Sequence, residues 1–143
     1  MKKTMKWIGA ALIAVAAFSL AACSTTMAES DGPAPAALQG SWTLVSWSDS
    51  APLPDQPITL QIEDARVSGN SACNNYSGPL TSDDSAFHVG LLATTMMLCA
   101  DDVNTAETTY QGLLTGANSW KISDGLLSLS KDGIEQLQFQ AAN

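Results

Sequence analysis

The chain has 143 residues, and its 14 acidic side chains outnumber 6 basic ones, which gives a formal net charge of −8 at pH 7. This balance argues against nucleic-acid binding, which needs a basic stripe, and against attraction to anionic lipid surfaces. It permits electrostatic steering of a cationic partner, although solubility is the simpler explanation.

The first 22 residues have the features of a signal peptide. Lys2, Lys3 and Lys6 precede an uncharged apolar run over residues 7–22. The run ends in Leu-Ala-Ala before Cys23, the form of a lipobox, in which the cysteine receives a diacylglyceryl group and becomes the first mature residue. A membrane-spanning helix is disfavoured because the run is shorter than the ~20 residues that a span needs. We therefore expect a bacterial lipoprotein with a signal peptide at residues 1–22.

Lipidation of Cys23 predicts attachment to the cell envelope, with the domain facing the periplasm. Ser24 stands where an aspartate would favour retention in the inner membrane, so in a bacterium with two membranes the outer membrane is expected. Cleavage removes three lysines and no acidic residue, which takes the formal charge to −11. Residues 23–37 are small, include two prolines and lack apolar periodicity, so we expect a lipidated tether.

The folded domain is expected over residues 38–143. Its first strand, residues 41–47, is rich in aromatic and β-branched side chains, and either carries apolar groups on both faces or leaves a tryptophan available for contacts. Residues 48–57 contain three prolines and must form a loop, since proline cannot donate to a sheet. Further strands are expected at residues 58–62, 66–69 and 76–81, and one or two more over residues 86–89 and 91–97.

Residues 69–78, with the sequence GNSACNNYSG, form the first of two motifs that contain cysteine. Gly69 and Gly78 can take positive φ without steric cost, and Asn74 and Asn75 tolerate it better than most residues. The segment is therefore predicted to be a tightly turned corner between two strands.

Residues 94–99, TTMMLC, form the second motif. With Cys23 lipidated, Cys73 and Cys99 are the remaining cysteines, and an oxidising compartment favours a disulfide between them over two buried thiols. Met96, Met97 and Leu98 are interpreted as core residues in preference to the lining of a ligand groove.

Residues 101–117 change to a helical period. Asp101 and Asp102 are expected to cap this helix and Gly116 to end it. Strands at residues 119–123, 126–129 and 134–139 follow, joined by hairpin turns. The fold class is therefore α+β: mainly antiparallel β, with a half-open, barrel-like sheet and one inserted helix. The apolar face of the helix consists of Val103, Ala106, Tyr110, Leu113, Leu114 and Ala117.

Residues suited to catalysis or metal binding are sparse. His88 could form a triad with Ser85 and Asp83 or Asp84, but neighbours in sequence rarely reach triad geometry. Zinc binding by Cys73, Cys99 and His88 would lack paired spacing and a fourth ligand. The pairs Asp83-Asp84 and Asp101-Asp102 lack the alternating carboxylates of a calcium-binding loop. We expect no enzyme, no metal and no cofactor.

The two motifs in this order resemble the META-domain family, the HslJ-like heat-shock lipoproteins. The resemblance covers residues 38–139, and Gly69, Asn74, Gly78 and Thr94 stand at positions of its structural motif. It implies a half-open antiparallel barrel interrupted by a helix, similar to small secretion-pilot lipoproteins, and a role in heat or antibiotic stress. It implies no catalytic residues. Further matching residues are Gly40, Trp42, Cys73, Met97, Cys99, Glu107 and Leu113.

The leading functional hypothesis is a non-enzymatic envelope lipoprotein that binds or stabilises another envelope component. Its expected partners are the membrane, through the lipid on Cys23, and an envelope protein or an apolar ligand. One alternative is an inhibitor of a cationic hydrolase such as a lysozyme, which the acidic charge favours. Another is a lipid-binding pilot for outer-membrane protein assembly, which the implied architecture favours.

Overall fold

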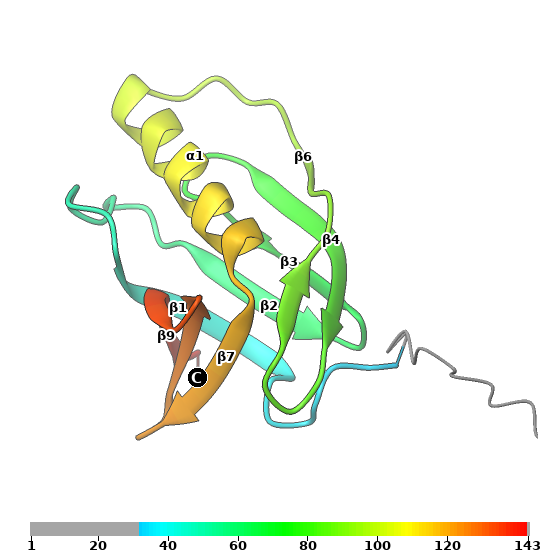
Figure 1. Ribbon diagram of the computed structural model, residues 1–143. Helices are drawn as coiled ribbons and strands as arrows, with labels where there is room; N and C mark the ends of the chain where they lie inside the picture. The colour runs from blue at the N-terminus through cyan, green and yellow to red at the C-terminus, as the bar shows by residue number, and fades with distance from the viewer. Residues whose placement is uncertain (1–31, 143) are drawn as a thin grey trace, which may run out of the picture.

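The computed structural model describes residues 32–142, which form one antiparallel sheet and one helix (Figure 1). The predicted signal peptide, the lipidation at Cys23 and residues 24–31 of the predicted tether lie outside the described residues. The elements are β1 (Gly40–Trp47), β2 (Thr59–Glu63), β3 (Arg66–Asn70), β4 (Asn75–Ser82), β5 (Phe87–Val89), β6 (Ala93–Thr94), α1 (Asp101–Gly116), β7 (Ser119–Ser123), β8 (Leu126–Lys131) and β9 (Ile134–Ala141).

The sheet curves until its two ends nearly meet. The strand order is β5-β4-β3-β2-β1-β9-β8-β7, with β6 also paired to β4. An isolated bridge joins Ala86, just before β5, to Ser119 at the start of β7. The Trp120 amide also donates to the Ser85 carbonyl oxygen at 2.9 Å. These few bonds leave a seam that is only partly sealed, so the predicted α+β class with a half-open barrel is confirmed.

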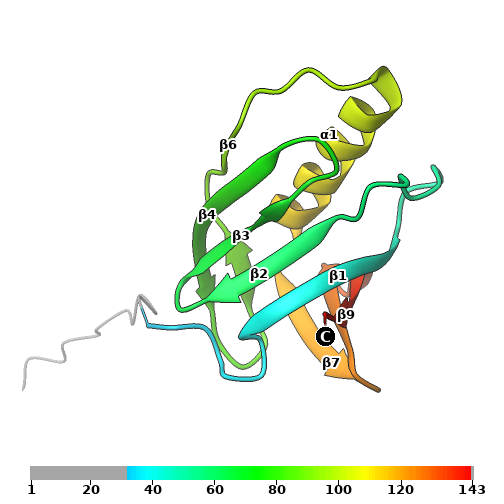
Figure 2. The same ribbon diagram turned by 180° about the vertical axis from the view of Figure 1, so that it is seen from behind.

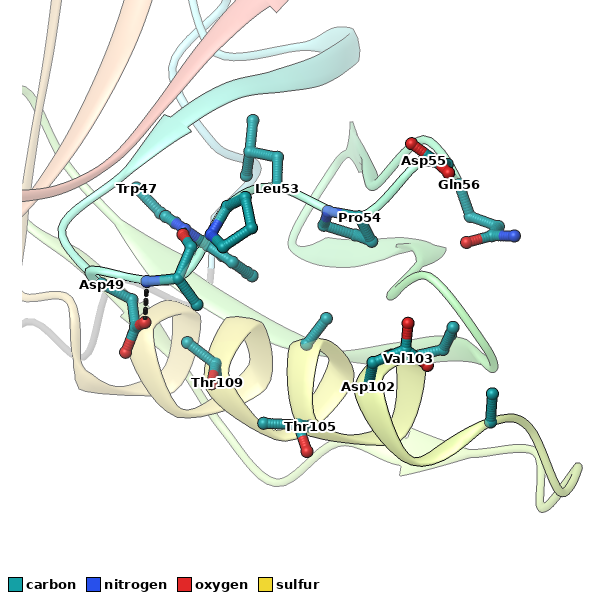
Figure 3. Close-up of a pocket in the computed structure, with 14 residues that line it drawn as sticks. Trp47, Asp49, Leu53, Pro54, Asp55, Gln56, Asp102, Val103, Thr105 and Thr109 are labelled. Carbon is teal, nitrogen blue, oxygen red and sulfur yellow. Dashed lines mark hydrogen bonds between the residues drawn. The ribbon is translucent and has the colours of Figure 1, made fainter.

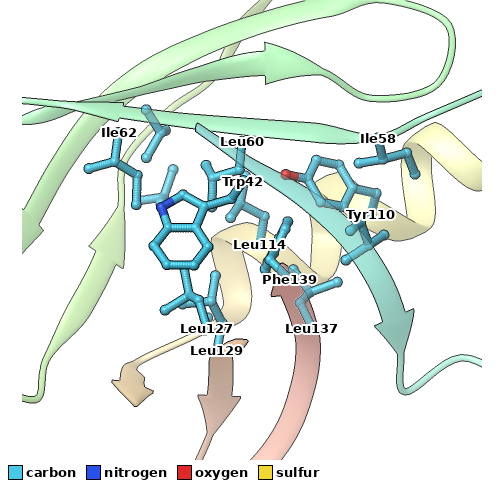
Figure 4. Close-up of a cluster of buried hydrophobic side chains, with 14 of the residues drawn as sticks. Trp42, Ile58, Leu60, Ile62, Tyr110, Leu114, Leu127, Leu129, Leu137 and Phe139 are labelled. Atoms are coloured by element: carbon cyan, nitrogen blue, oxygen red, sulfur yellow. The ribbon is translucent and has the colours of Figure 1, made fainter. Parts of the chain in front are cut away.

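Helix α1 packs its apolar face against the concave side of the sheet (Figure 4). Ala106, Tyr110 and Leu114 are its buried residues, as the period of the sequence predicts. Burial of each large apolar side chain stabilises the fold by about 1.5 to 3 kcal/mol. The interior of the barrel is filled by fully buried side chains, which include Leu38, Leu60, Ile62, Val67, Phe87, Leu127, Leu129, Leu137 and Phe139.

The ends of α1 differ from the prediction. Ala100 is the N-cap residue and offers no side-chain hydrogen bond, so Asp101 and Asp102 lie inside the first turn. Their negative charge still suits the positive end of the helix dipole. Gly116 is the last helical residue, and the chain leaves the helix through Ala117 in an extended conformation. The helix therefore ends without the left-handed glycine that the sequence suggested.

The C-terminal hairpins turn as predicted. Asp124 and Gly125 have φ values of 54° and 78°, and Asp132 and Gly133 have 52° and 81°. Positive φ at both central residues matches the right-handed twist of the flanking strands. The two turns connect β7 to β8 and β8 to β9.

The strand predicted at residues 91–97 is mostly absent. Only Ala93 and Thr94 form a strand, by pairing with Ser77 and Tyr76 of β4. After Thr95 the chain leaves β4 and crosses to the start of α1, as Figure 1 shows along its upper edge. Strand pairing therefore ends early because this segment has to bridge two separate elements.

Candidate functional site

The corner between β3 and β4 is covalently joined to the segment before α1. Cys73 and Cys99 form a disulfide with a Cα–Cα distance of 6.1 Å. Cys73 is buried, and Cys99 is half-buried. Of the two interpretations that the sequence left open, the structure contains the disulfide rather than two buried thiols. The bond fixes the position from which α1 begins.

Asn74 holds the same segment by hydrogen bonds. Its Oδ1 accepts from the Thr95 hydroxyl at 2.8 Å and from the Met97 amide at 2.7 Å. Its Nδ2 donates to Glu107 Oε2 on α1 at 3.0 Å. The sequence suggested that Asn74 and Asn75 would take positive φ, but the residue that does so is Ala72, at 86°. Asn74 is buried because its side chain joins three segments of the fold.

The other motif residues also serve the corner. A Cβ atom on Gly69 would lie 2.1 Å from the Thr59 carbonyl oxygen, so only glycine fits there. Gly78 makes room for the segment that passes beside β4, because its Cβ would lie 3.1 Å from the Leu91 carbonyl oxygen. Thr94 pairs with Tyr76 in the ladder between β4 and β6.

The interpretation of Met96, Met97 and Leu98 as core residues is wrong. Their exposed fractions are 95%, 54% and 98%. The disulfide and the Asn74 hydrogen bonds hold the backbone here, while the side chains project away from the barrel. An apolar ridge of these three residues therefore lies on the surface.

A cleft of about 560 Å³ separates the loop after β1 from the N-terminal half of α1 (Figure 3). The loop side is held by two hydrogen bonds, from Trp47 Nε1 to the Ala51 carbonyl oxygen at 2.8 Å and from the Ala51 amide to Asp49 Oδ1 at 2.7 Å. Trp42 is buried and Trp47 is half-buried, so the structure matches the alternative in which the first strand leaves a tryptophan available. The lining residues are Trp47, Asp49, Ala51, Pro52, Leu53, Pro54, Asp55, Gln56, Ala100, Asp102, Val103, Thr105, Ala106 and Thr109.

The cleft combines an apolar lining with negative charge. Trp47, Leu53 and Val103 are partly buried and pack against the core below. Asp49 and Asp55 come from the loop, and Asp102 comes from the first turn of α1. None of Arg66, Lys121 and Lys131, the basic residues of the described chain, lines it. The cleft is therefore an acidic surface with an apolar floor.

Asp83 and Ser85, which were considered for a triad, form a turn instead. Asp83 Oδ1 accepts from the amides of Ser85 and Ala86 at 2.8 and 2.7 Å. The amides of Ala86 and Ser85 lower the pKa of the Asp83 carboxyl below its ordinary value. His88 is exposed on β5.

Metal ligands do not gather either. Cys73 and Cys99 are oxidised and so offer no thiolate for zinc. Within residues 32–142 no group of three His, Cys, Asp or Glu side chains is placed to hold a metal ion. In the same part of the chain no helix has the length and apolar character of a membrane span.

The fold and the site define a small α+β domain with a curved antiparallel sheet, a disulfide-bonded corner and a surface cleft beside its helix. The chain belongs to the META domain family, which matches residues 36–143. This is a family of bacterial stress-related proteins and includes the HslJ-like proteins. The resemblance recognised from the two cysteine motifs is thus confirmed.

Two solved structures share this fold. One is the NMR structure of a protein from Burkholderia xenovorans, with 25% sequence identity and a TM-score of 0.62 over 73% of this chain and 83% of that chain. Another NMR structure has 20% identity and a TM-score of 0.55 over 72% of this chain and 89% of that chain, and this likeness concerns the fold alone. No curated protein matches the chain.

Proposed function

We propose that this protein is a non-enzymatic lipoprotein of the bacterial envelope, anchored through Cys23, that binds another envelope protein in the course of heat or antibiotic stress. The observation that carries the proposal is the cleft between the loop after β1 and α1. Binding sites are typically concave, mainly apolar and equipped with a few polar groups, and cavities of about 300 to 1,000 Å³ are usual. At about 560 Å³ this cleft has such dimensions.

The direction of the cleft supports a partner that lies away from the anchoring membrane. Ala34 donates its amide hydrogen to the Asp64 carbonyl oxygen at 2.8 Å, which fixes the N-terminal segment beside the turn between β2 and β3. Figures 1 and 2 place this turn at one end of the barrel and the start of α1 at the other. In the proposed lipoprotein, a tether that reaches Ala34 would therefore join the domain at the end opposite the cleft and leave the cleft accessible to a partner.

The filled barrel favours a surface site over an internal one. Tyr110, Phe87 and Phe139 are fully buried inside the sheet, together with many aliphatic side chains. An acyl chain of the kind that a lipid-binding pilot carries would have to displace them. Protein binding in the surface cleft needs no such rearrangement of the core.

Site-specific photo-cross-linking in intact cells tests the proposal. A photoreactive amino acid at Thr105, which lines the cleft and is exposed, is compared with the same group at Glu135, an exposed position on β9. We expect a discrete adduct with an envelope protein from position 105, none from position 135, and loss of the adduct in the Cys23→Ala variant. No adduct from position 105, or the same adduct from both positions, would overturn the proposal.

A further inference from the structure

We infer that the cleft takes a basic amphipathic protein segment, with an arginine or lysine next to an apolar side chain. The inference rests on the proposed function, because it names the chemistry of the partner for the same site. It draws on three features of the cleft: its apolar floor, its carboxylates and its lack of basic residues.

The floor provides the apolar half of the recognition. Trp47, Leu53 and Val103 offer partly buried surface, and Pro54 and Ala106 extend it on the two walls. Figure 3 shows the loop that carries Trp47, Asp49 and Pro54 on one side of the opening and α1 on the other. Burial of a leucine-sized side chain against this floor removes apolar surface from water and therefore favours binding.

The carboxylates determine the charge of the occupant. Asp49, Asp55 and Asp102 lie on both sides of the opening and are exposed. Asp101 and Asp102 also offset the positive end of the helix dipole, so α1 offers little attraction to an anion. A phosphate, a fatty-acid carboxylate or an acidic peptide would be repelled, whereas a cationic side chain would be attracted.

The carboxylates select a positively charged group, and Trp47 also restricts where that group can lie. Its indole N–H donates to the Ala51 carbonyl oxygen at 2.8 Å, which fixes the ring in the lining of the cleft. A guanidinium or ammonium group placed over an indole face is attracted by the π-system. Arginine satisfies this contact and the carboxylates at the same time, since its planar fork can both stack and donate hydrogen bonds.

Two model peptides test the inference on the mature chain carrying Cys23→Ala, which avoids detergent. The first is an acetylated and amidated hexapeptide of alternating arginine and leucine, and the second has glutamine in place of each arginine. Binding is measured at low salt by amide chemical shifts and by titration. We expect the arginine peptide to shift the amides of Trp47, Asp55 and Val103 and to bind at least about 5-fold more tightly than the glutamine peptide.

Two double variants that remove the same charge distinguish an effect of the cleft from an effect of the overall negative charge. Asp55→Asn with Asp102→Asn should weaken binding about 5-fold. The control pair Asp84→Asn with Glu135→Gln lies outside the cleft, removes the same charge and should leave the affinity within twofold. Equal weakening by both pairs, or equal binding of the two peptides, would overturn the inference.

The cross-linking experiment makes the two failures distinguishable. If a partner is captured at position 105 while the arginine peptide has no advantage, the binding function stands and the basic-segment inference is wrong. If the peptide binds as expected and no partner is captured, the chemistry of the cleft stands and the proposed envelope function is wrong.

Discussion

The Tyr110 hydroxyl on α1 donates a hydrogen bond to the Tyr76 hydroxyl on β4, with an O–O distance of 2.7 Å. The direction follows from the single proton on each hydroxyl, because Tyr76 uses its own proton to reach the Thr59 carbonyl oxygen at 2.8 Å. Burial raises the pKa of both phenols above their ordinary value. The helix is thus joined to two strands by a buried polar chain inside an otherwise apolar core.

Removal of the two hydroxyls is predicted to have unequal effects. Tyr110→Phe leaves Tyr76 bonded to Thr59 and should cost about 0.5 to 1.5 kcal/mol of unfolding free energy. Tyr76→Phe leaves the buried Tyr110 hydroxyl and the Thr59 carbonyl without partners and should cost about 1 to 3 kcal/mol. Urea unfolding of both variants and of the double variant provides the measurement. A double variant less stable than the sum of its parts would contradict this chain of bonds.

The Cys73–Cys99 disulfide is predicted to supply about 3 to 4 kcal/mol, because it closes a loop between residues 26 positions apart. That is a large share of the free energy of unfolding of about 5 to 15 kcal/mol that is usual for a small domain. Urea unfolding with and without reductant measures this contribution. The Cys73→Ser/Cys99→Ser variant serves as the control. Its free energy of unfolding should equal that of the reduced wild type and should not change when reductant is added. Free thiols on both cysteines in periplasmic protein, detected by alkylation, would rule the bond out.

Asn74→Asp is predicted to destabilise the corner by about 1 to 3 kcal/mol at neutral pH. The new carboxylate would lose the donated hydrogen bond to Glu107 and place two negative charges side by side. Adding Glu107→Gln should restore part of the loss, because it removes the repulsion. Thermal unfolding of the single and double variants measures the coupling, and a double variant with no recovery would show that Glu107 is not the cause.

Gly69→Ala is predicted to destabilise the protein by at least about 2 kcal/mol, since its Cβ would overlap the Thr59 carbonyl oxygen. The matched control is Gly112→Ala on α1, where a Cβ meets nothing within 4 Å. That change should stabilise the protein by about 0.5 to 1 kcal/mol, because alanine favours a helix. We expect the two substitutions to change the free energy of unfolding, measured in urea, in opposite directions. No change in stability for Gly69→Ala would show that the corner can relax.

Local sequence pattern accounts for the helix, most strands and the hairpin turns. It placed Tyr110 on the buried face of α1, yet it could not name Tyr76 as the hydroxyl partner 34 residues away. Such a contact is decided by how the sheet curves. The fold class could be predicted because periodicity is local, whereas the polar chain in the core depends on tertiary packing.

The exposed ridge and the cleft show a second limit of the sequence. Met96 and Leu98 have the apolar character of core residues, but the chain there must connect β6 to α1 under the constraint of Cys99 and Asn74. The prolines of residues 48–57 correctly predicted a loop. That this loop lies opposite Val103 follows from the position of the helix across the barrel, which no local pattern records.

The stability of the barrel seam is predicted to depend on pH through Asp83. Its carboxylate holds the turn whose Ser85 carbonyl oxygen accepts from the Trp120 amide of β7. The folded-state pKa of Asp83 is lowered by the amides of Ala86 and Ser85. This stabilisation is therefore complete above the unfolded pKa of about 3.9 and is lost as pH falls through the lower folded value.

Asp83→Asn isolates the charge, because its amide oxygen can still accept both hydrogen bonds. We expect its Tm to lie below that of the wild type at pH 6 and the two values to converge as pH is lowered towards 2. Hydrogen exchange at the Trp120 amide should be faster in the variant at pH 6, since that amide reports on the seam. A Tm difference that stays constant with pH would show that the Asp83 charge does not hold the turn.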